Sequence, residues 1–313
     1  MTTFAFVFPG QGSQAVGMLD AWGGDAAVRQ TLQEASDALG EDVAKLIHAG
    51  PKEQLDLTTN TQPVMLTAGI ACYRAWLAET GMAPSVVAGH SLGEYTALVA
   101  AGSLTLADAL PLVRFRAQAM QDAVPVGIGA MAAILGMDAQ AVREGCLEVV
   151  AATGEAVEAV NFNDPKQTVI AGTKAGVEKA CEVLKAKGAK RALSLPVSAP
   201  FHSSLMKPAA ERLKVRLAET NFATPTIDVI NNIDVKIETG APAIRDALYR
   251  QAFGPVRWVE TVQAIRARGV THLIECGPGK VLAGMVKRID ADAISGAVLD
   301  PATMADVKGL LAW

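Results

Sequence analysis

The sequence contains few cysteines and no long uncharged apolar run, and these absences argue against several classes of protein. The four cysteines lie far apart, with no Cys-x-x-Cys pair and no Cys/His cluster. This spacing favours neither a zinc site nor a disulfide framework, and it predicts reduced thiols in a cytoplasmic protein. No stretch reaches the roughly 18 apolar residues that a membrane span requires. No basic segment precedes the first short apolar run, so we expect no export signal.

An excess of charge of one sign is also lacking. The 28 Lys and Arg residues are balanced by 32 Asp and Glu, which leaves a net charge of −4. No overall field attracts nucleic acid or an anionic membrane, and we expect the protein to bind neither. The chain has 313 residues and is 50% apolar, so it can bury a large core in one domain or in two smaller ones.

A Gly-x-Ser-x-Gly pattern stands out among the features that are present. An apolar run, 86–88, leads into Gly89-His90-Ser91-Leu92-Gly93, and a helical pattern follows. Strand, sharp turn and helix in this order are typical of a nucleophile elbow, whose glycines make room for an exposed serine. The amide of Leu92 would then lie at a helix N-terminus, where it suits a developing oxyanion. Ser91 is therefore a candidate nucleophile, and a chance glycine-rich turn is the alternative.

A second loop, 9–14, follows the apolar strand predicted at 3–8. Open α/β sheets bind ligands at the C-terminal ends of their strands. The loop lacks the Gly-Lys-Ser/Thr ending of a phosphate loop. Gln11 either belongs to an ordinary turn or brings a second backbone donor beside Ser91.

Two helical patterns flank the elbow. Asn60 or Thr61 can cap the first helix, with Pro63 in its first turn, and Thr105 can cap the second. Arg116 falls on the apolar stripe of the second helix, so its guanidinium points toward the core. A buried guanidinium needs an anion, which is either an internal Asp or Glu or a substrate carboxylate.

His202 is the candidate general base. It follows a proline-pinned loop and precedes a helix, whereas His90 belongs to the elbow and His48 and His272 flank apolar runs. A histidine within reach of a serine hydroxyl is what nucleophilic catalysis requires. A loop histidine can equally be inert.

The pattern between residues 127 and 196 changes to short alternating elements. It predicts strand, helix, strand, strand, helix and strand at 131–135, 139–150, 157–162, 167–171, 173–186 and 191–195. This βαββαβ order is typical of a ferredoxin-like subdomain. We expect an α/β protein whose main body, residues 1–126 and 197–313, is interrupted by this subdomain, 127–196. A last helix is predicted to begin near Lys280.

Six motifs along the chain resemble the bacterial malonyl-CoA:acyl carrier protein transacylases of type II fatty acid synthesis. The resemblance covers nearly the whole chain, and chance agreement of all six in order is negligible. It implies an α/β-hydrolase-like main body with the active site between that body and the ferredoxin-like subdomain. The motifs are Phe8-Pro9-Gly10-Gln11-Gly12-Ser13-Gln14, Asn60-Thr61-Gln62-Pro63, Gly89-His90-Ser91-Leu92-Gly93-Glu94, Arg116 with Met120-Gln121, Pro196-Val197-Ser198-x-Pro200-x-His202 and Glu275-x-Gly277-Pro278-Gly279-Lys280.

The resemblance also implies roles for the candidate catalytic residues. Ser91 corresponds to the nucleophile and His202 to its base. The amides of Gln11 and Leu92 correspond to the oxyanion hole. The backbone carbonyl of Gln251 corresponds to the group that orients the histidine, in place of the usual Asp of a triad.

Further implications concern the substrate and the partners. Arg116 corresponds to the residue that binds the malonyl carboxylate, and malonyl-CoA and acyl carrier protein are the implied partners. Because one thioester replaces another, we expect no metal and no cofactor. Phe201 departs from the usual small residue of the stand-alone enzymes and resembles malonyl-selective domains of polyketide synthases. Use in a polyketide pathway therefore stays open.

A basic patch is a candidate docking surface, because acyl carrier proteins are acidic. It comprises Lys187, Lys190 and Arg191, with Lys287 and Arg288 on the last predicted helix. Such a run is also typical of a solvated helix end. Two other classes remain as alternatives: a serine hydrolase or thioesterase with the same elbow, and a binding module, which should have lost the catalytic residues.

Overall fold

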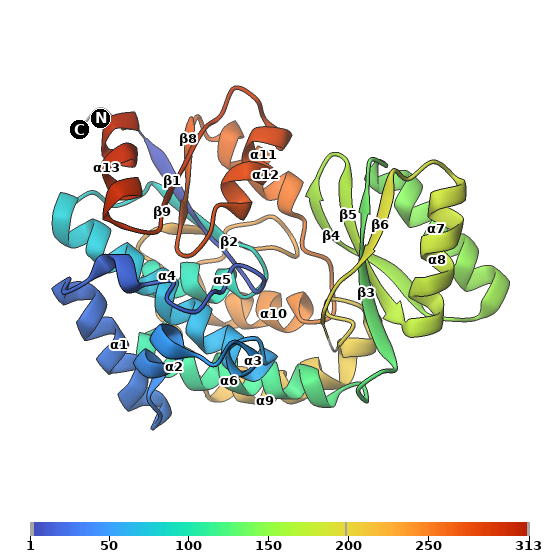
Figure 1. Ribbon diagram of the computed structural model, residues 1–313, viewed down its shortest axis with the longest axis horizontal. Helices are drawn as coiled ribbons and strands as arrows, with labels where there is room; N and C mark the ends of the chain where they lie inside the picture. Colours follow the sequence, from blue (N-terminus) through green and yellow to red (C-terminus); the bar gives the residue numbers. More distant parts are fainter. Residues whose placement is uncertain (1–2, 198, 312–313) are drawn as a thin grey trace.

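The computed structural model describes residues 3–197 and 199–311 and shows a large α/β body with a smaller one at its side (Figure 1). The larger body is built on a parallel five-stranded sheet with the order β7-β2-β1-β8-β9. Its strands are β1 (Phe4–Phe8), β2 (Val86–Gly89), β7 (Asp228–Ile230), β8 (His272–Cys276) and β9 (Ile294–Val298).

The central strand β1 is buried on both faces, which explains its unbroken apolar sequence. Phe4, Phe6 and Phe8 point into the larger hydrophobic core. Ala5 and Val7 alternate with them and pack in a second core formed with helices on the opposite face. Helices therefore cover both faces of the sheet, and the ends of its strands are where a site can form.

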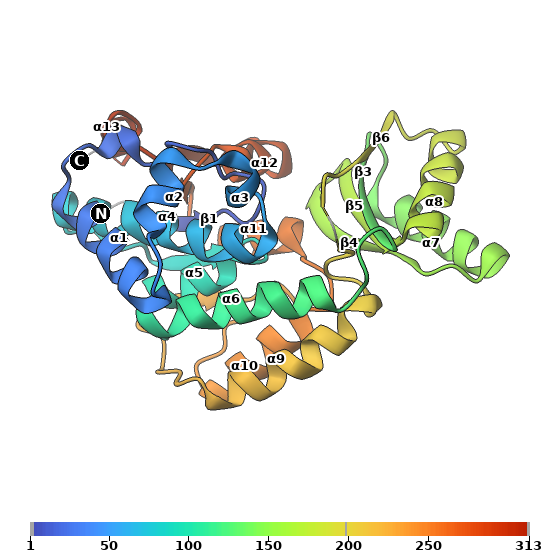
Figure 2. The ribbon, with the colours of Figure 1, turned by 60° about the horizontal axis from the view of Figure 1, so that its bottom comes forward.

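Helices cover both faces of this sheet. On the side of the phenylalanines lie α1 (Ala26–Leu39), α4 (Thr58–Thr80), α5 (Gly93–Ala100) and α6 (Leu106–Asp122). On the other side lie α11 (Trp258–Ala267) and α12 (Val281–Ile289). Figure 2 shows α6 beside α9 (Lys207–Glu219) and α10 (Ala241–Gln251). The remaining helical segments of the body are η1 (Asp20–Trp22), α2 (Val43–Ala49), α3 (Lys52–Leu55), η2 (Ser204–Met206) and α13 (Pro301–Leu310).

The prediction for the start of α4 is wrong by about one turn. The helix begins at Thr58, after Leu57, so Pro63 lies inside it and not in its first turn. In the first turn, the side chain of Thr61 donates to the carbonyl of Leu57 at 3.1 Å and to that of Leu55 at 2.6 Å. By contrast, the Thr105 side chain does cap α6, by accepting from the Asp108 amide.

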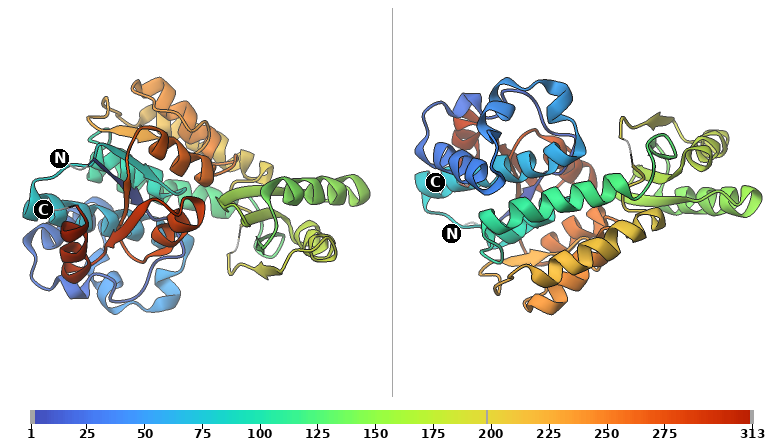
Figure 3. Two further views of the ribbon diagram at one scale, coloured as in Figure 1. Left: turned by 90° about the horizontal axis from the view of Figure 1, so that it is seen from above. Right: turned by 90° about the horizontal axis from the view of Figure 1, so that it is seen from below.

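The smaller body confirms the predicted ferredoxin-like order. It consists of β3 (Gly129–Leu135), α7 (Ala139–Thr153), β4 (Val157–Asp164), β5 (Gln167–Thr173), α8 (Lys174–Ala186) and β6 (Arg191–Ser194). Its strands form an antiparallel sheet with the order β4-β5-β3-β6. Figure 3 shows this body projecting from one end of the molecule. The division of the chain at residues 127 and 196 stays a prediction.

One face of the second sheet packs on α7 and α8, and the other faces the main body. Ile134 and Ile170 belong to the core under the two helices. Met131 and Val169 belong to the large core of the main body. Strand β4 also contacts α11 and α12. Between the two bodies lies a pocket that is lined in part by residues following β1 and β2.

Helix α12 begins after Lys280, as predicted, but it is not the last helix, because the chain continues through β9 and α13. Strand β9 pairs with β8 at the edge of the main sheet. Its five residues include Gly296 in the middle, and glycine is unfavourable in strands, so the sequence alone does not predict a strand here. The pairing with β8 is what identifies it. Asp300 caps helix α13, because its carboxylate accepts from the Thr303 amide. Within residues 3–197 and 199–311, no helix is long and apolar enough to cross a membrane.

Candidate active site

The nucleophile elbow is present where the sequence predicts it. Between β2 and α5, Ser91 has a φ of 53°, a left-handed conformation that is strained for a residue with a Cβ. A Cβ at Gly89 would lie 1.9 Å from the carbonyl carbon of Gly93, and one at Gly93 would lie 2.1 Å from the oxygen of Phe8. Only glycine fits either position, so both glycines are needed to present the serine.

His202 meets Ser91 although 111 residues separate them in sequence. Its Nε2 lies 2.7 Å from Ser91 Oγ, and its Nδ1 lies 2.9 Å from the backbone oxygen of Gln251. The carbonyl can only accept, so Nδ1 carries the proton and Nε2 is free to accept the serine proton. Burial, followed by the charge of Arg116, lowers the pKa of His202 to about 3, so the ring is neutral at pH 7.

Gln251 orients this histidine and also makes three contacts through its side chain. Its Nε2 donates to the backbone oxygen of Ser91 and to Glu94 Oε2, each at 3.0 Å. Its Oε1 accepts from Arg116 at 3.0 Å. The residue is fully buried at the end of α10. The sequence pointed to its carbonyl alone, and these side-chain contacts could not be predicted.

Arg116 is buried beside the serine, with only 2% of its surface exposed. The guanidinium donates to Gln62 Oε1 at 2.8 Å, to Gln251 Oε1 at 3.0 Å and to Ser91 Oγ at 3.2 Å. It also lies 5.4 Å from the centre of the Tyr95 ring. All these partners are neutral, and among the described residues Arg116 forms no ion pair. The buried cation therefore lacks the direct anionic partner that its burial demands.

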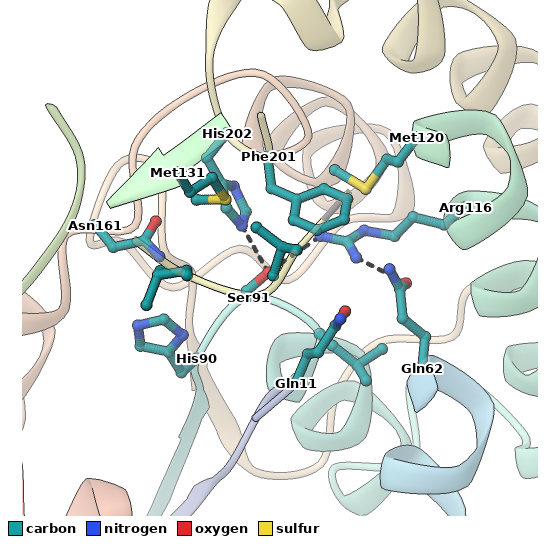
Figure 4. Close-up of a pocket in the computed structure, with 13 residues that line it drawn as sticks. Gln11, Gln62, His90, Ser91, Arg116, Met120, Met131, Asn161, Phe201 and His202 are labelled. Carbon is teal, nitrogen blue, oxygen red and sulfur yellow. Dashed lines mark hydrogen bonds between the residues drawn. The ribbon is translucent and has the colours of Figure 1, made fainter. Parts of the chain in front are cut away.

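A pocket opens over Ser91 between the two bodies (Figure 4). The main body contributes the elbow, Arg116 and His202, and the small body contributes Met131 and Asn161. The complete lining is Gln11, Gln62, His90, Ser91, Leu92, Arg116, Met120, Met131, Asn161, Leu195, Val197, Phe201 and His202. The pocket thus brings the predicted site residues Gln11, Ser91, Leu92, Arg116 and His202 together, and their roles stay predictions.

Gln11 and Leu92 face this pocket from two loops in contact. A Cβ at Gly10 would lie 2.6 Å from the backbone oxygen of His90, which shows how closely the first loop approaches the elbow. Among the described residues, neither the Gln11 nor the Leu92 amide has a backbone acceptor. Two free N–H groups beside a serine hydroxyl are suited to binding an oxyanion.

The supporting roles of Asn232 and Glu94 were not predicted from the sequence, although Glu94 belongs to the elbow motif. Asn232 accepts from the Ser91 amide and donates to the Gly89 carbonyl, both at 2.7 Å, and so ties the two ends of the turn together. Glu94 Oε2 accepts from the Asn232 amide at 2.8 Å. The only signal was the pair of asparagines that follows β7, because polar residues at strand ends mark ligand sites.

The candidate docking residues do not form one cluster. Lys190 and Arg191 are exposed at the start of β6. Arg288 on α12 lies near the other edge of the sheet, where its Nε is 2.7 Å from Asp164 at the end of β4. Lys187 pairs with Glu148 at 2.5 Å. Lys190 and Arg191 thus remain the core of the proposed surface, and Arg288 is partly neutralised.

One predicted motif residue, Ser198, lies outside the described residues. Phe201 is 9% exposed and lines the pocket beside His202.

Among the described residues, no three His, Cys, Asp or Glu side chains gather as a metal site would require.

The chain matches a family model and proteins of known structure along almost its whole length. Residues 5–310 match the acyl transferase domain. The malonyl CoA-acyl carrier protein transacylase of Escherichia coli K12 is 54% identical over 306 residues, which are 97% of this chain and 98% of the relative.

Solved structures that resemble this chain are also malonyl transacylases. An acyl-carrier-protein S-malonyltransferase from Burkholderia pseudomallei is 64% identical, with a TM-score of 0.97 and full coverage of both chains. A malonyl transacylase solved with its type II polyketide synthase acyl carrier protein is 50% identical, with a TM-score of 0.96 and full coverage of both chains. The chain belongs to the acyl transferase domain family and, within it, to the malonyl CoA-acyl carrier protein transacylases.

Proposed function

We propose that the protein transfers a malonyl group from coenzyme A to the phosphopantetheine thiol of acyl carrier protein and so supplies fatty acid synthesis. The observation that carries this proposal is the buried guanidinium of Arg116, whose partners within the described part of the chain are all neutral and which lies 3.2 Å from Ser91 Oγ. An acyl group that ends in a carboxylate provides the missing anion while its thioester carbon lies near the serine.

The first half-reaction forms an ester on Ser91. The serine oxygen attacks the thioester carbonyl carbon while His202 Nε2 takes the hydroxyl proton. The carbonyl oxygen becomes an oxyanion, which the amides of Gln11 and Leu92 stabilise. When the tetrahedral intermediate collapses, the carbon–sulfur bond breaks and the coenzyme A thiolate leaves with the proton from His202. Malonyl-O-serine remains.

The second half-reaction reverses these steps with a different thiol. The phosphopantetheine thiol of the carrier gives its proton to His202 and attacks the ester carbonyl, and Ser91 Oγ leaves and regains a proton. One thioester replaces another, so the transfer needs neither ATP nor a metal or redox cofactor. Two substrates that use one site in turn predict ping-pong kinetics.

The serine hydrolase alternative is less well supported. Water would have to replace the carrier thiol, and a neutral ester would leave Arg116 without an anion in the pocket.

Relatives that act with carrier proteins include one from a polyketide pathway. Comparing a fatty acid carrier with a polyketide carrier as acceptor tests which pathway the enzyme serves. A cytoplasmic location stays a prediction, based on the unpaired cysteines and the coenzyme A donor.

A transfer assay tests the proposed function. Purified protein, malonyl-CoA and phosphopantetheinylated carrier are mixed, and the malonyl carrier is measured by mass. Parallel lines in double-reciprocal plots are expected, and carrier that lacks phosphopantetheine should accept nothing. Release of free malonate at the same rate with and without carrier would contradict the proposal and favour the hydrolase.

The docking surface has its own test. Charge reversal at Lys190 and Arg191 should raise the KM for the carrier, because acidic carriers lose a complementary surface, and should leave the KM for malonyl-CoA unchanged. Charge reversal at Lys179, an exposed lysine on α8 paired with Glu182, is the control. Equal effects on both substrates would contradict docking at this end of the small body.

A further inference from the structure

Glu94 is a buried carboxyl group that the transfer reaction does not use. It lies in the first turn of α5 and is 2% exposed. Its Oε2 accepts from the Asn232 amide at 2.8 Å and from Gln251 Nε2 at 3.0 Å. Burial is the main reason that the pKa of Glu94 is raised to about 7.

A single amide side chain connects Glu94 to Arg116. Gln251 accepts from the guanidinium through Oε1 and donates to the carboxylate through Nε2, each at 3.0 Å. This order fixes the orientation of the amide, because turning it over would set its NH2 group against the guanidinium donors. A buried cation and a buried acid thus face each other across one hydrogen-bonded amide, without touching.

In the part of the chain that the structure describes, few other charges face Glu94. Asp234 raises its pKa slightly, but that carboxylate is itself paired with Arg250 at 2.8 Å. Tyr95 and His202 are neutral near pH 7, since burial raises the pKa of Tyr95 to about 12 and lowers that of His202 to about 3. Arg116 is the positive group that lowers the pKa of Glu94.

We propose that Glu94 is the counter-charge of Arg116 in the empty site, acting through Gln251, and that it takes up a proton from solvent when an acyl carboxylate binds Arg116. This inference rests on the proposed function, because it requires a carboxylate-bearing acyl group. Glu94 is a positioning residue, since it acts on the substrate through Gln251 and Arg116 and does not touch it.

The reason is the balance of buried charge. With the site empty, one guanidinium and one partly ionised carboxyl face each other. A substrate carboxylate adds a second negative charge to the same buried region and disfavours ionisation of Glu94. The added proton goes to Oε1, because Oε2 already accepts both hydrogen bonds. The site then holds one cation and one anion in direct contact.

Calorimetric titration measures this proton. Malonyl-pantetheine, which lacks the titrating phosphates of coenzyme A, is added to a Ser91→Ala variant in two buffers with different ionisation enthalpies. From an empty-site pKa of about 7, uptake approaching about half a proton is expected at pH 7, and almost none at pH 5.5. Acetyl-pantetheine should cause none, and Glu94→Gln should abolish the uptake with malonyl-pantetheine.

Several results would overturn the inference. Malonyl-pantetheine could bind without any buffer dependence, or the uptake could persist in the Glu94→Gln background, which would assign it to another group such as His202. Equal proton uptake at pH 5.5 and pH 7 would also contradict the inference. This comparison does not use a Glu94 variant, so it remains available if Glu94→Gln fails to fold. Failure of the parent protein to form a malonyl ester on Ser91 would instead overturn the proposed function, and the inference with it.

Discussion

Replacing Arg116 with alanine should remove the preference for malonyl over acetyl groups. The guanidinium is 2% exposed, and its acceptors among residues 3–197 and 199–311 are neutral side chains. With malonyl bound it would form a buried pair with the carboxylate, whereas with acetyl bound it remains without an anion. The loss of one partner of a buried pair costs about 3–5 kcal/mol. That cost corresponds to a selectivity of roughly two to three and a half orders of magnitude.

The ratio of kcat/KM for malonyl-CoA to that for acetyl-CoA is the quantity to measure, in a competition assay. Arg116→Ala also leaves Gln62 and Gln251 without a donor, but that defect affects both substrates and cancels in the ratio. Arg114→Ala is the matched control, because Arg114 lies on the same helix and pairs with Glu41 at the surface. An unchanged ratio in Arg116→Ala would refute the role of Arg116.

Three further predictions concern the elbow, a buried acid and the pocket wall. Gly93→Ala would place a Cβ 2.1 Å from a backbone oxygen and should destabilise the fold by roughly 3 kcal/mol or more in chemical denaturation. Gly309→Ala, whose Cβ would have no atom of the described residues within 4 Å, should not. Burial raises the pKa of Glu275 from 4.5 to about 7, so its contribution to stability is complete below pH 4.5 and is lost as the pH rises to 7. The stability of the parent relative to Glu275→Gln should therefore fall by about 3 kcal/mol over that range, and a constant difference would contradict the assignment. Phe201→Ser should raise the use of methylmalonyl-CoA relative to malonyl-CoA by roughly tenfold or more, because it opens space for one methyl group, and an unchanged ratio would show that Phe201 does not limit the acyl group.

Local patterns were sufficient to predict much of this structure. Short alternating runs with turn residues between them identified all six elements of the small body. Gly89 and Gly93 identified the elbow because a Cβ at either position would meet backbone atoms within about 2.1 Å, a local constraint that leaves a mark in the sequence.

The predictions failed where long-range contacts decide the structure. Strand β9 depends on pairing with β8, 22 residues earlier in register. The buried network of Glu94 and Asn232 joins segments that are 138 residues apart. No spacing rule connects such residues, so their roles became visible only in the folded chain.

The most direct test of the central claim is intact-protein mass spectrometry after brief exposure to malonyl-CoA. The parent should gain one malonyl group, should gain far less acetyl from acetyl-CoA, and should lose the malonyl group when phosphopantetheinylated carrier is added. Ser91→Ala should gain nothing. A parent protein without a malonyl adduct, or an adduct that water removes as fast as the carrier does, would contradict the account.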